Sequence, residues 1–277
     1  MTYGIVNKII PFSAVDGPGN RTVVFLQSCN FQCLNCHNPE TISFCSHCGI
    51  CIDFCNSDAL KIIDNVVIWN KNNCTSCDEC IKNCPTNSSP KTTQFSVDEL
   101  LNKIEKYSVF TSGITISGGE CTVQSDFLLE FLKKAKQKGI SAFIDSNLHV
   151  ETEKLKELAN YFDKAMPDVK SYNLEKHKLL TGQSSNLVLK NLNFLLKSDK
   201  VFEIRTVIIP NILNNEETIS EVSKIIAIHN PKLRYKLIKY RKTGVKTPDF
   251  ANEPSDELMQ KLKIIAQNNG CENILIV

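Results

Sequence analysis

The sequence feature that most constrains the fold is a trio of closely spaced cysteines, Cys29, Cys33 and Cys36, directly behind the strand-like run 22–26. Thiolates at gaps of three and two residues can each reach a different iron of one [4Fe–4S] cube. No fourth cysteine follows closely, so one iron would stay open, and an open position marks a metal site that does chemistry. The alternatives are a zinc loop or chance clustering, but zinc sites usually pair two CxxC hairpins.

A second cysteine pattern fills residues 42–91, where helical periodicity disappears. Two runs share one spacing, the first ending Cys55-Asn56 and the second ending Cys84-Pro85. This is the spacing of two-cluster bacterial ferredoxins, in which the fourth cysteine of each run binds the other cluster. Structural zinc is the alternative, although three ligands per CxxCxxC suit a cube better than a tetrahedron. One cluster should therefore take Cys45, Cys48, Cys51 and Cys84, and the other Cys55, Cys74, Cys77 and Cys80.

The chain around this segment alternates strand and helix patterns. Residues 1–12 read as an apolar lead-in, 13–21 as a turn-rich loop, and 61–69 as a hairpin turning at Asp64-Asn65. Ser96 and Glu99 form a capping-box pattern, which predicts a helix to about Lys106. The alternation predicts a parallel α/β barrel, open or closed, and periodicity alone does not separate that from a doubly wound sheet. Expected strands are 113–117, 141–145, 164–169, 202–209, 234–239 and 273–277, and expected helices are 127–138, 150–162, 174–197, 216–229 and 255–268.

Composition narrows the class of protein. The 277 residues are 42% hydrophobic, and 32 basic against 30 acidic side chains leave a net charge of +2, so nothing favours nucleic acid or a membrane as partner. The N-terminal residues lack signal-peptide features. Cysteines in a cytosolic chain are metal ligands more often than disulfide partners. Clusters of this kind are sensitive to oxygen, so we expect a protein of the anaerobic cytoplasm. We also expect a monomer.

The cysteine trio and its flanks resemble a known family. CxxxCxxC behind a first strand is similar to the radical S-adenosylmethionine (SAM) superfamily, and the flanking runs 15–21 (VDGPGNR) and 36–41 (CHNPET) resemble the activating enzymes of glycyl radical enzymes. The opening 9–19 and the cysteine-rich segment look most like the YjjW-like members. The resemblance implies a partial (βα)6 TIM-type barrel from residues 1–41 and 92–277, with 42–91 as an inserted ferredoxin-like 2[4Fe–4S] domain.

The resemblance also implies contacts to SAM, although each motif alone would pass for a solvated strand end. Gly118, Gly119 and Glu120 match the motif that takes the methionine amino group. Asn35 replaces the usual aromatic residue and Arg241 a frequent histidine, which changes the expected adenine contacts. His37 beside the cluster is also a candidate. Further matches are the ribose-side Asp145 and Ser146, the carboxylate-side Asp168, Val169, Lys170 and Arg205, and a monovalent cation site at Asp145 and Asp168.

The function implied is that of an activase. Three [4Fe–4S] clusters and SAM are the expected cofactors, a glycyl radical enzyme the protein substrate, and a flavodoxin or ferredoxin the electron donor. A radical SAM enzyme acting on another peptide or small molecule is the alternative. A pure electron carrier is a third, but it leaves the barrel and its cofactor motifs without a role.

Overall fold

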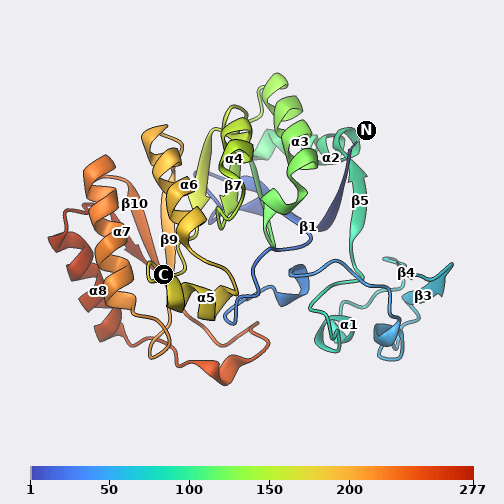
Figure 1. The fold of residues 1–277 in the computed structure, drawn as a ribbon. Helices are drawn as coiled ribbons and strands as arrows, with labels where there is room; N and C mark the ends of the chain where they lie inside the picture. Colours follow the sequence, from blue (N-terminus) through green and yellow to red (C-terminus); the bar gives the residue numbers. More distant parts are fainter. Residues whose placement is uncertain (1) are drawn as a thin grey trace.

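A curved sheet of parallel strands forms the frame of the protein, for which the computed structural model describes residues 2–277 (Figure 1). Consecutive parallel pairs run from β2 to β6, β7 and β8, and from β9 to β10 and β11. The bounds are β2 (Arg21–Leu26), β6 (Gly113–Gly118), β7 (Ala142–Ser146), β8 (Lys164–Pro167), β9 (Glu203–Ile208), β10 (Arg234–Lys239) and β11 (Ile274–Ile276).

Two short contacts join β8 to β9 and make the sheet continuous. Ala165 bridges Val201, and Asp168 bridges Arg205, both in parallel register. Each of the strands β2 and β6–β10 is followed by at least one helix, so the expected α/β alternation is confirmed. Between β5 and β11, the edge strands at the two ends of this order, no backbone pairing occurs within residues 2–277, so the barrel stays open there.

The N-terminal part differs from the expectation. The predicted lead-in is an eleven-residue strand, β1 (Tyr3–Ser13), which pairs antiparallel with β2 on one side and with β5 (Thr93–Ser96) on the other. The expected all-parallel sheet is therefore wrong at this edge, and the sheet is mixed. Residues 93–96 carry no strand signal of their own, and their pairing with residues 3–6 arises only when the chain folds.

Helices cover the outer face of the sheet. They are α2 (Val97–Glu105), α3 (Ser125–Gln137), α4 (Thr152–Ala159), α5 (Leu174–Thr181), α6 (Asn186–Lys197), α7 (Asn215–His229) and α8 (Asp256–Asn268). The capping box of Ser96 and Glu99 is confirmed. The single helix predicted over 174–197 is wrong, because Gly182 adopts a left-handed φ of 81° and ends α5.

One continuous apolar core lies between the strands and these helices, with members such as Val24, Ile116, Ile144, Leu128 and Leu192, all fully buried. Among residues 2–277 no helix combines the length and apolar character needed to cross a membrane. Short 3-10 turns complete the chain at Pro39–Thr41, Ile50–Ile52, Ser108–Phe110, Cys121–Gln124 and Pro248–Phe250.

The cysteine-rich segment is drawn as a small lobe beside β5 (Figure 1). Its hairpin of β3 (Leu60–Ile63) and β4 (Val66–Trp69) turns at Asp64 and Asn65, which both have positive φ, as predicted. The short α1 (Glu79–Lys82) follows. A separate apolar cluster with Cys51, Leu60, Val67 and Cys80 as its buried members fills the lobe, so cysteines supply half of the buried residues of this cluster.

We predict that Gly118→Ala strongly destabilises the fold. Gly118 has φ +135°, and a Cβ there would lie 2.1 Å from the Leu26 carbonyl oxygen of β2. Overpacking and backbone strain together should cost about 3 kcal/mol of unfolding free energy, measured by urea denaturation. Gly139→Ala is the control, because φ is +69° but nothing lies within 4 Å, and it should cost about 1 kcal/mol. Equal losses would contradict the close packing.

Candidate functional site

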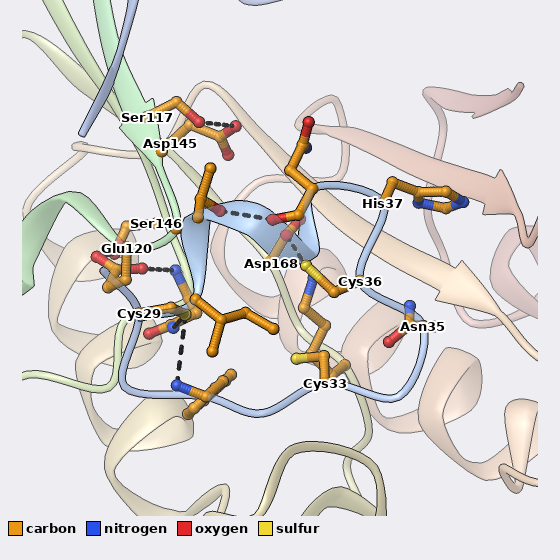
Figure 2. Close-up of a pocket in the computed structure, with 18 of the residues that line it drawn as sticks. Cys29, Cys33, Asn35, Cys36, His37, Ser117, Glu120, Asp145, Ser146 and Asp168 are labelled. Carbon is orange, nitrogen blue, oxygen red and sulfur yellow. Dashed lines mark hydrogen bonds and ion pairs between the residues drawn. The ribbon is translucent and has the colours of Figure 1, made fainter. Parts of the chain in front are cut away.

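The cysteine trio lies in a loop at the carboxyl edge of the parallel sheet, directly behind β2. Cys29, Cys33 and Cys36 line a cavity of about 350 Å³ together with the ends of β6, β7, β8 and β9. Figure 2 shows the three cysteines on this loop together with Glu120 and Asp168, which also line the cavity. The volume falls in the range of small-molecule binding pockets.

Backbone hydrogen bonds from two directions fix the cysteine loop. On one side, Cys29 N donates to the Ile42 carbonyl over 2.8 Å and Ser28 N to the Thr41 carbonyl over 2.9 Å. On the other side, Gln32 N and Leu34 N donate to carbonyls at the C-terminal end of α5. Protein contacts on both sides therefore help set the shape of the loop.

An aromatic side chain anchors the middle of the same loop. Phe31 is buried between the imidazoles of His149 and His177, with ring centroids 5.4 Å away in each case. Asn30 donates to the His149 carbonyl. The loop thus packs on the β7–α4 connection as well as on α5.

Burial makes the three thiols weak acids in the metal-free protein. It raises the pKa of Cys29 to about 12 and that of Cys33 to about 11, and it also raises the pKa of Cys36. Thiols must lose these protons to act as metal ligands, so iron uptake would release protons and would be favoured by higher pH. Three unpaired thiols on a fixed loop beside an open cavity fit a [4Fe–4S] cluster with one free iron.

Asn35 also points to a ligand in this cavity. The residue is 4% exposed and lines the cavity, and its Oδ1 has no hydrogen-bond partner among the described residues. A buried carbonyl oxygen without a donor costs free energy. A bound molecule with an N–H or O–H group would satisfy it.

Glu120 is already held by the protein. Its Oε1 accepts from the Thr122 N–H and hydroxyl and from the Ser146 hydroxyl, and its Oε2 accepts from Asn147 N over 2.6 Å. A carboxylate offers about four acceptor positions in all, and Oε1 already accepts three hydrogen bonds. Only Oε2 can therefore accept a further hydrogen bond from a ligand's ammonium. Because Ser146 and Asn147 donate to Glu120, this carboxylate also fixes the end of β7.

Gly118 and Gly119 line the cavity, but the space where their Cβ atoms would lie faces protein. A Cβ on Gly119 would come within 2.5 Å of the Ser28 and Thr41 carbonyl oxygens. These glycines permit β6 to approach the start of the cysteine loop closely. Their backbone remains available to a ligand on the cavity side.

Acidic and basic side chains meet at the ends of β7, β8 and β9. Asp145 pairs with Arg205 over 3.2 Å, and Asp168 pairs with Lys170 over 2.6 Å. Burial raises the pKa of Asp145 to about 6, although Arg205 opposes the rise. Burial opposes the charge of Lys170, but Asp168 and the Cys33 sulfur outweigh it, so the pKa of Lys170 is raised.

Arg205 is locked in place by a residue that the sequence reading missed. Its Nε donates to Glu203 Oε1 over 2.6 Å, and Glu203, at 1% exposure, also pairs with Lys236 and Arg234. Burial opposes the charge of Arg205, but Asp145 and Glu203 outweigh it and raise its pKa. Glu203 thus turns the guanidinium toward the cavity.

The structure does not bring every predicted residue to the cavity. Val169 is fully buried behind it and donates its N–H to the Arg205 carbonyl. The Arg241 side chain is exposed and outside the cavity lining, whereas its carbonyl bonds the His37 ring over 2.9 Å. His37, Asn35, Ser146 and the other predicted residues do line it.

Two further lining residues were missed as site residues. Asp16, in the turn-rich loop, lines the cavity, and its carbonyl accepts from Thr115 Oγ1 over 2.6 Å. Asn147 lines it as well and donates to Asn30. Asp16 lies within the run 15–21 that carries the family resemblance, and Asn147 directly follows Ser146 at the end of the third predicted strand, so their positions were the available signal.

The eight cysteines of the 42–91 segment separate into two groups of four. Cys45, Cys48, Cys51 and Cys84 line one small cavity, which we call cavity A. Cys55, Cys74, Cys77 and Cys80 line a second, cavity B, and Cys80 also reaches cavity A. These are the two crossed sets that the ferredoxin spacing predicts, and four thiols in each group fit a four-iron cube.

Cavity A is the one joined to the barrel. Ser43 N donates to the Asn87 carbonyl over 3.0 Å, and Ser43 bridges Ser88, which lines cavity A. Ser43 directly follows Ile42, the partner of Cys29. Lys246, from the loop after β10, donates to the Cys84 carbonyl over 3.2 Å.

Comparisons with known proteins agree with this geometry. The model of the radical SAM superfamily matches residues 23–226. The chain is 33% identical over 262 residues to a (2S)-3-sulfopropanediol sulfolyase activating enzyme of Bilophila wadsworthia, covering 87% of this chain and 86% of that protein. It is 31% identical over 249 residues to a 4-hydroxyphenylacetate decarboxylase activating enzyme of Clostridioides difficile, covering 82% and 79%.

A solved structure shows the same fold. QueE from Escherichia coli superimposes with a TM-score of 0.54 at 13% identity, over 99% of this chain and 94% of that one.

We predict a pH-dependent stability contribution from Asp145. Its folded pKa of about 6 lies above the ordinary value, so the contribution is full below pH ~4 and is lost as pH rises through ~6. Asp145→Asn removes this dependence. Between pH 5 and 7 the parent should lose about 1 kcal/mol of unfolding free energy relative to the variant. Urea denaturation of the metal-free proteins measures it, and parallel pH curves would contradict it.

Proposed function

The chain belongs to the radical SAM superfamily, among the activating enzymes of glycyl radical enzymes, and from this premise we propose how its residues divide the work. The observation that carries the proposal is the convergence of three unpaired thiols, Cys29, Cys33 and Cys36, on one cavity whose lining also holds paired charges. The opening at residues 9–19 and the cysteine-rich segment support the YjjW-like type within the family.

Three thiolates would hold a [4Fe–4S] cluster and leave one iron for SAM. When bound, this cofactor pair would supply the radical chemistry: the cluster, reduced by an external electron donor, would pass one electron to SAM, whose C5′–S bond breaks to methionine and a 5′-deoxyadenosyl radical that takes hydrogen from a glycine Cα of the partner enzyme. The protein supplies placement and exclusion of water.

Residues at the strand ends that line the cavity would orient SAM. Lys170 and Arg205 are the cations suited to its carboxylate, since a guanidinium can bind a carboxylate through two hydrogen bonds. Glu120 Oε2 and the backbone at Gly118 and Gly119 suit its ammonium. Asp145 and Ser146 suit the ribose side, and Asn35 Oδ1 an adenine donor. Asp145 and Asp168 would also hold a monovalent cation.

Several residues contribute less directly. His37 fixes the loop after β10 through the Arg241 carbonyl, and Val169 sets the β8–β9 register through its N–H. We therefore assign both residues, and Arg241, to shaping the cavity wall.

We also propose that residues 42–91 form an inserted ferredoxin-like domain with two further clusters, while 1–41 and 92–277 form the barrel domain. The two groups of four cysteines support this assignment. The direct join between cavity A and the cysteine loop suits electron delivery from a flavodoxin or ferredoxin. The protein would act as a monomer in an anaerobic cytoplasm, on a glycyl radical enzyme whose gene we expect nearby.

The first prediction from this proposal concerns Cys29, Cys33 and Cys36. Anaerobically reconstituted protein should hold about twelve irons, four per cube, and the triple alanine variant about eight. The variant should form no 5′-deoxyadenosine from SAM and no glycyl radical, followed by chromatography and electron paramagnetic resonance. Continued 5′-deoxyadenosine formation would reject the site.

The second prediction concerns crossed ligation. Cys55→Ala should remove the cluster of Cys74, Cys77 and Cys80, because these four thiols share cavity B. Trp69, the one tryptophan of the chain, also lines cavity B, so its fluorescence should rise when a quenching cluster is lost.

Cys84→Ala is the matched control for this experiment. It should lose a similar amount of iron from cavity A and leave Trp69 quenched. The reverse fluorescence pattern would mean that each cysteine run binds its own cluster.

A further inference from the structure

Cavities A and B have similar thiol sets but differ in charge. Cavity B is lined by Lys91, whose side chain is 14% exposed, and by the indole of Trp69. No charged side chain lines cavity A within residues 2–277. The two cavities would therefore treat the same kind of cluster differently.

The Trp69 indole is a donor without an ordinary acceptor. Its Nε1 is buried and makes no hydrogen bond in the described chain. Trp69 lines cavity B together with Cys74 and Lys91. An N–H donor without an acceptor and an ammonium in the same lining both favour negative charge in cavity B.

The hydroxyl groups close to the cysteines do not favour cavity B in the way that Trp69 and Lys91 do. The crossing cysteine of each cavity has a hydroxyl two residues on, from Ser57 to Cys55 over 3.7 Å and from Thr86 to Cys84 over 3.5 Å. Cys84 also has Ser88 Oγ at 3.5 Å. Cavity A also has two backbone donors, His47 N to Cys45 Sγ and Ser88 N to Cys84 Sγ, each over 3.4 Å. These neutral contacts favour cavity A, and the Lys91 ammonium of cavity B outweighs them because Coulomb interactions strengthen with burial.

Two other charges weaken the contrast without removing it. Asp78 pairs with Lys91 over 2.6 Å, but its side chain is 56% exposed and is not part of the cavity B lining. Lys246 approaches cavity A at the Cys84 carbonyl, but it is exposed, so solvent and salt screen its charge.

We propose that Trp69 and Lys91 make cavity B the higher-potential site of the insert, so that a cluster held by Cys55, Cys74, Cys77 and Cys80 is reduced before the one in cavity A. This inference rests on the proposed two-cluster insert. Reduction adds negative charge to a cluster, and a nearby ammonium and an N–H near a ligand sulfur both stabilise that charge. The two residues act through the cluster environment and are positioning residues.

The test is a redox titration followed by electron paramagnetic resonance. The full-length Cys29, Cys33 and Cys36 triple alanine variant removes the signal of the barrel cluster. In this background we expect two reduction steps with different midpoint potentials. The equilibrium constants for reducing the two clusters should differ by at least about tenfold, which is a difference of about 59 mV for a one-electron step. Lys91→Met and Trp69→Phe should each shift the higher-potential step to more negative values and leave the lower one in place.

Matched variants separate the effect of the Lys91 charge on the potential from a general effect of substitution on the lobe. Lys91→Arg keeps the charge and should retain the potential of the background protein. Lys82→Met removes an exposed lysine of the same lobe that pairs with Glu79 and lines neither cavity, and it should shift neither step. Lys246→Met should affect only the lower-potential step, and weakly.

The outcomes distinguish the two levels of the argument. Fewer than about eight irons in the triple variant would reject the two-cluster insert and, with it, this inference. Eight irons with a single common potential, or a Lys91→Met shift confined to the lower step, would overturn the inference and leave the insert standing. If Lys91→Met loses iron, its potentials cannot be compared with those of the background protein. The shift of the higher-potential step in Trp69→Phe then decides whether the inference holds.

Discussion

The hydrogen bonds that hold the cysteine loop behind β2 are the constraint on which the rest of the site depends. Ser28 and Cys29 pair with Thr41 and Ile42, while Gln32 and Leu34 pair with the end of α5. Each pairing needs a different part of the chain in place. Because Gly118 and Gly119 lack side chains, β6 can reach the start of this loop and bring Glu120 to the cavity. Loop shape and cavity shape are thus set together.

Buried charges at the strand ends follow from the same geometry. Parallel strands bring their carboxyl ends to one edge, so Asp145, Asp168 and Arg205 meet although they lie far apart in sequence. Isolated charges would be costly there, and the pairs reduce that cost. Glu203 extends the network below the cavity by binding Arg205, Lys236 and Arg234. The result is a cavity with fixed charges that can orient a zwitterionic ligand.

The small lobe follows another principle. Its apolar cluster holds only four fully buried residues, two of them cysteines, so metal clusters would contribute much of its stability. Its two cysteine groups are interleaved, which ties the first and second runs to each other. The hydrogen bond from Cys29 N to the Ile42 carbonyl then joins the start of the lobe to the barrel, next to the Ser43–Asn87 hydrogen bond within the lobe. The lobe is therefore attached where an electron would be needed.

The sequence by itself determined the cysteine spacing, the crossed grouping it predicts, the hairpin at Asp64-Asn65, the capping box at Ser96 and the order of strands and helices, because these are local patterns. It also placed most cavity residues at strand ends. The break at Gly182 is also a local signal, a glycine that ends a helix in the left-handed conformation, although the single helix predicted over 174–197 overlooked it. Only the tertiary structure decided the antiparallel edge of β1 and β5, the anchoring role of Glu203, the turning of Arg241 away from the cavity and the charge difference between cavities A and B. Each of these depends on contacts between residues distant in the chain, which leave no periodic signal in the sequence.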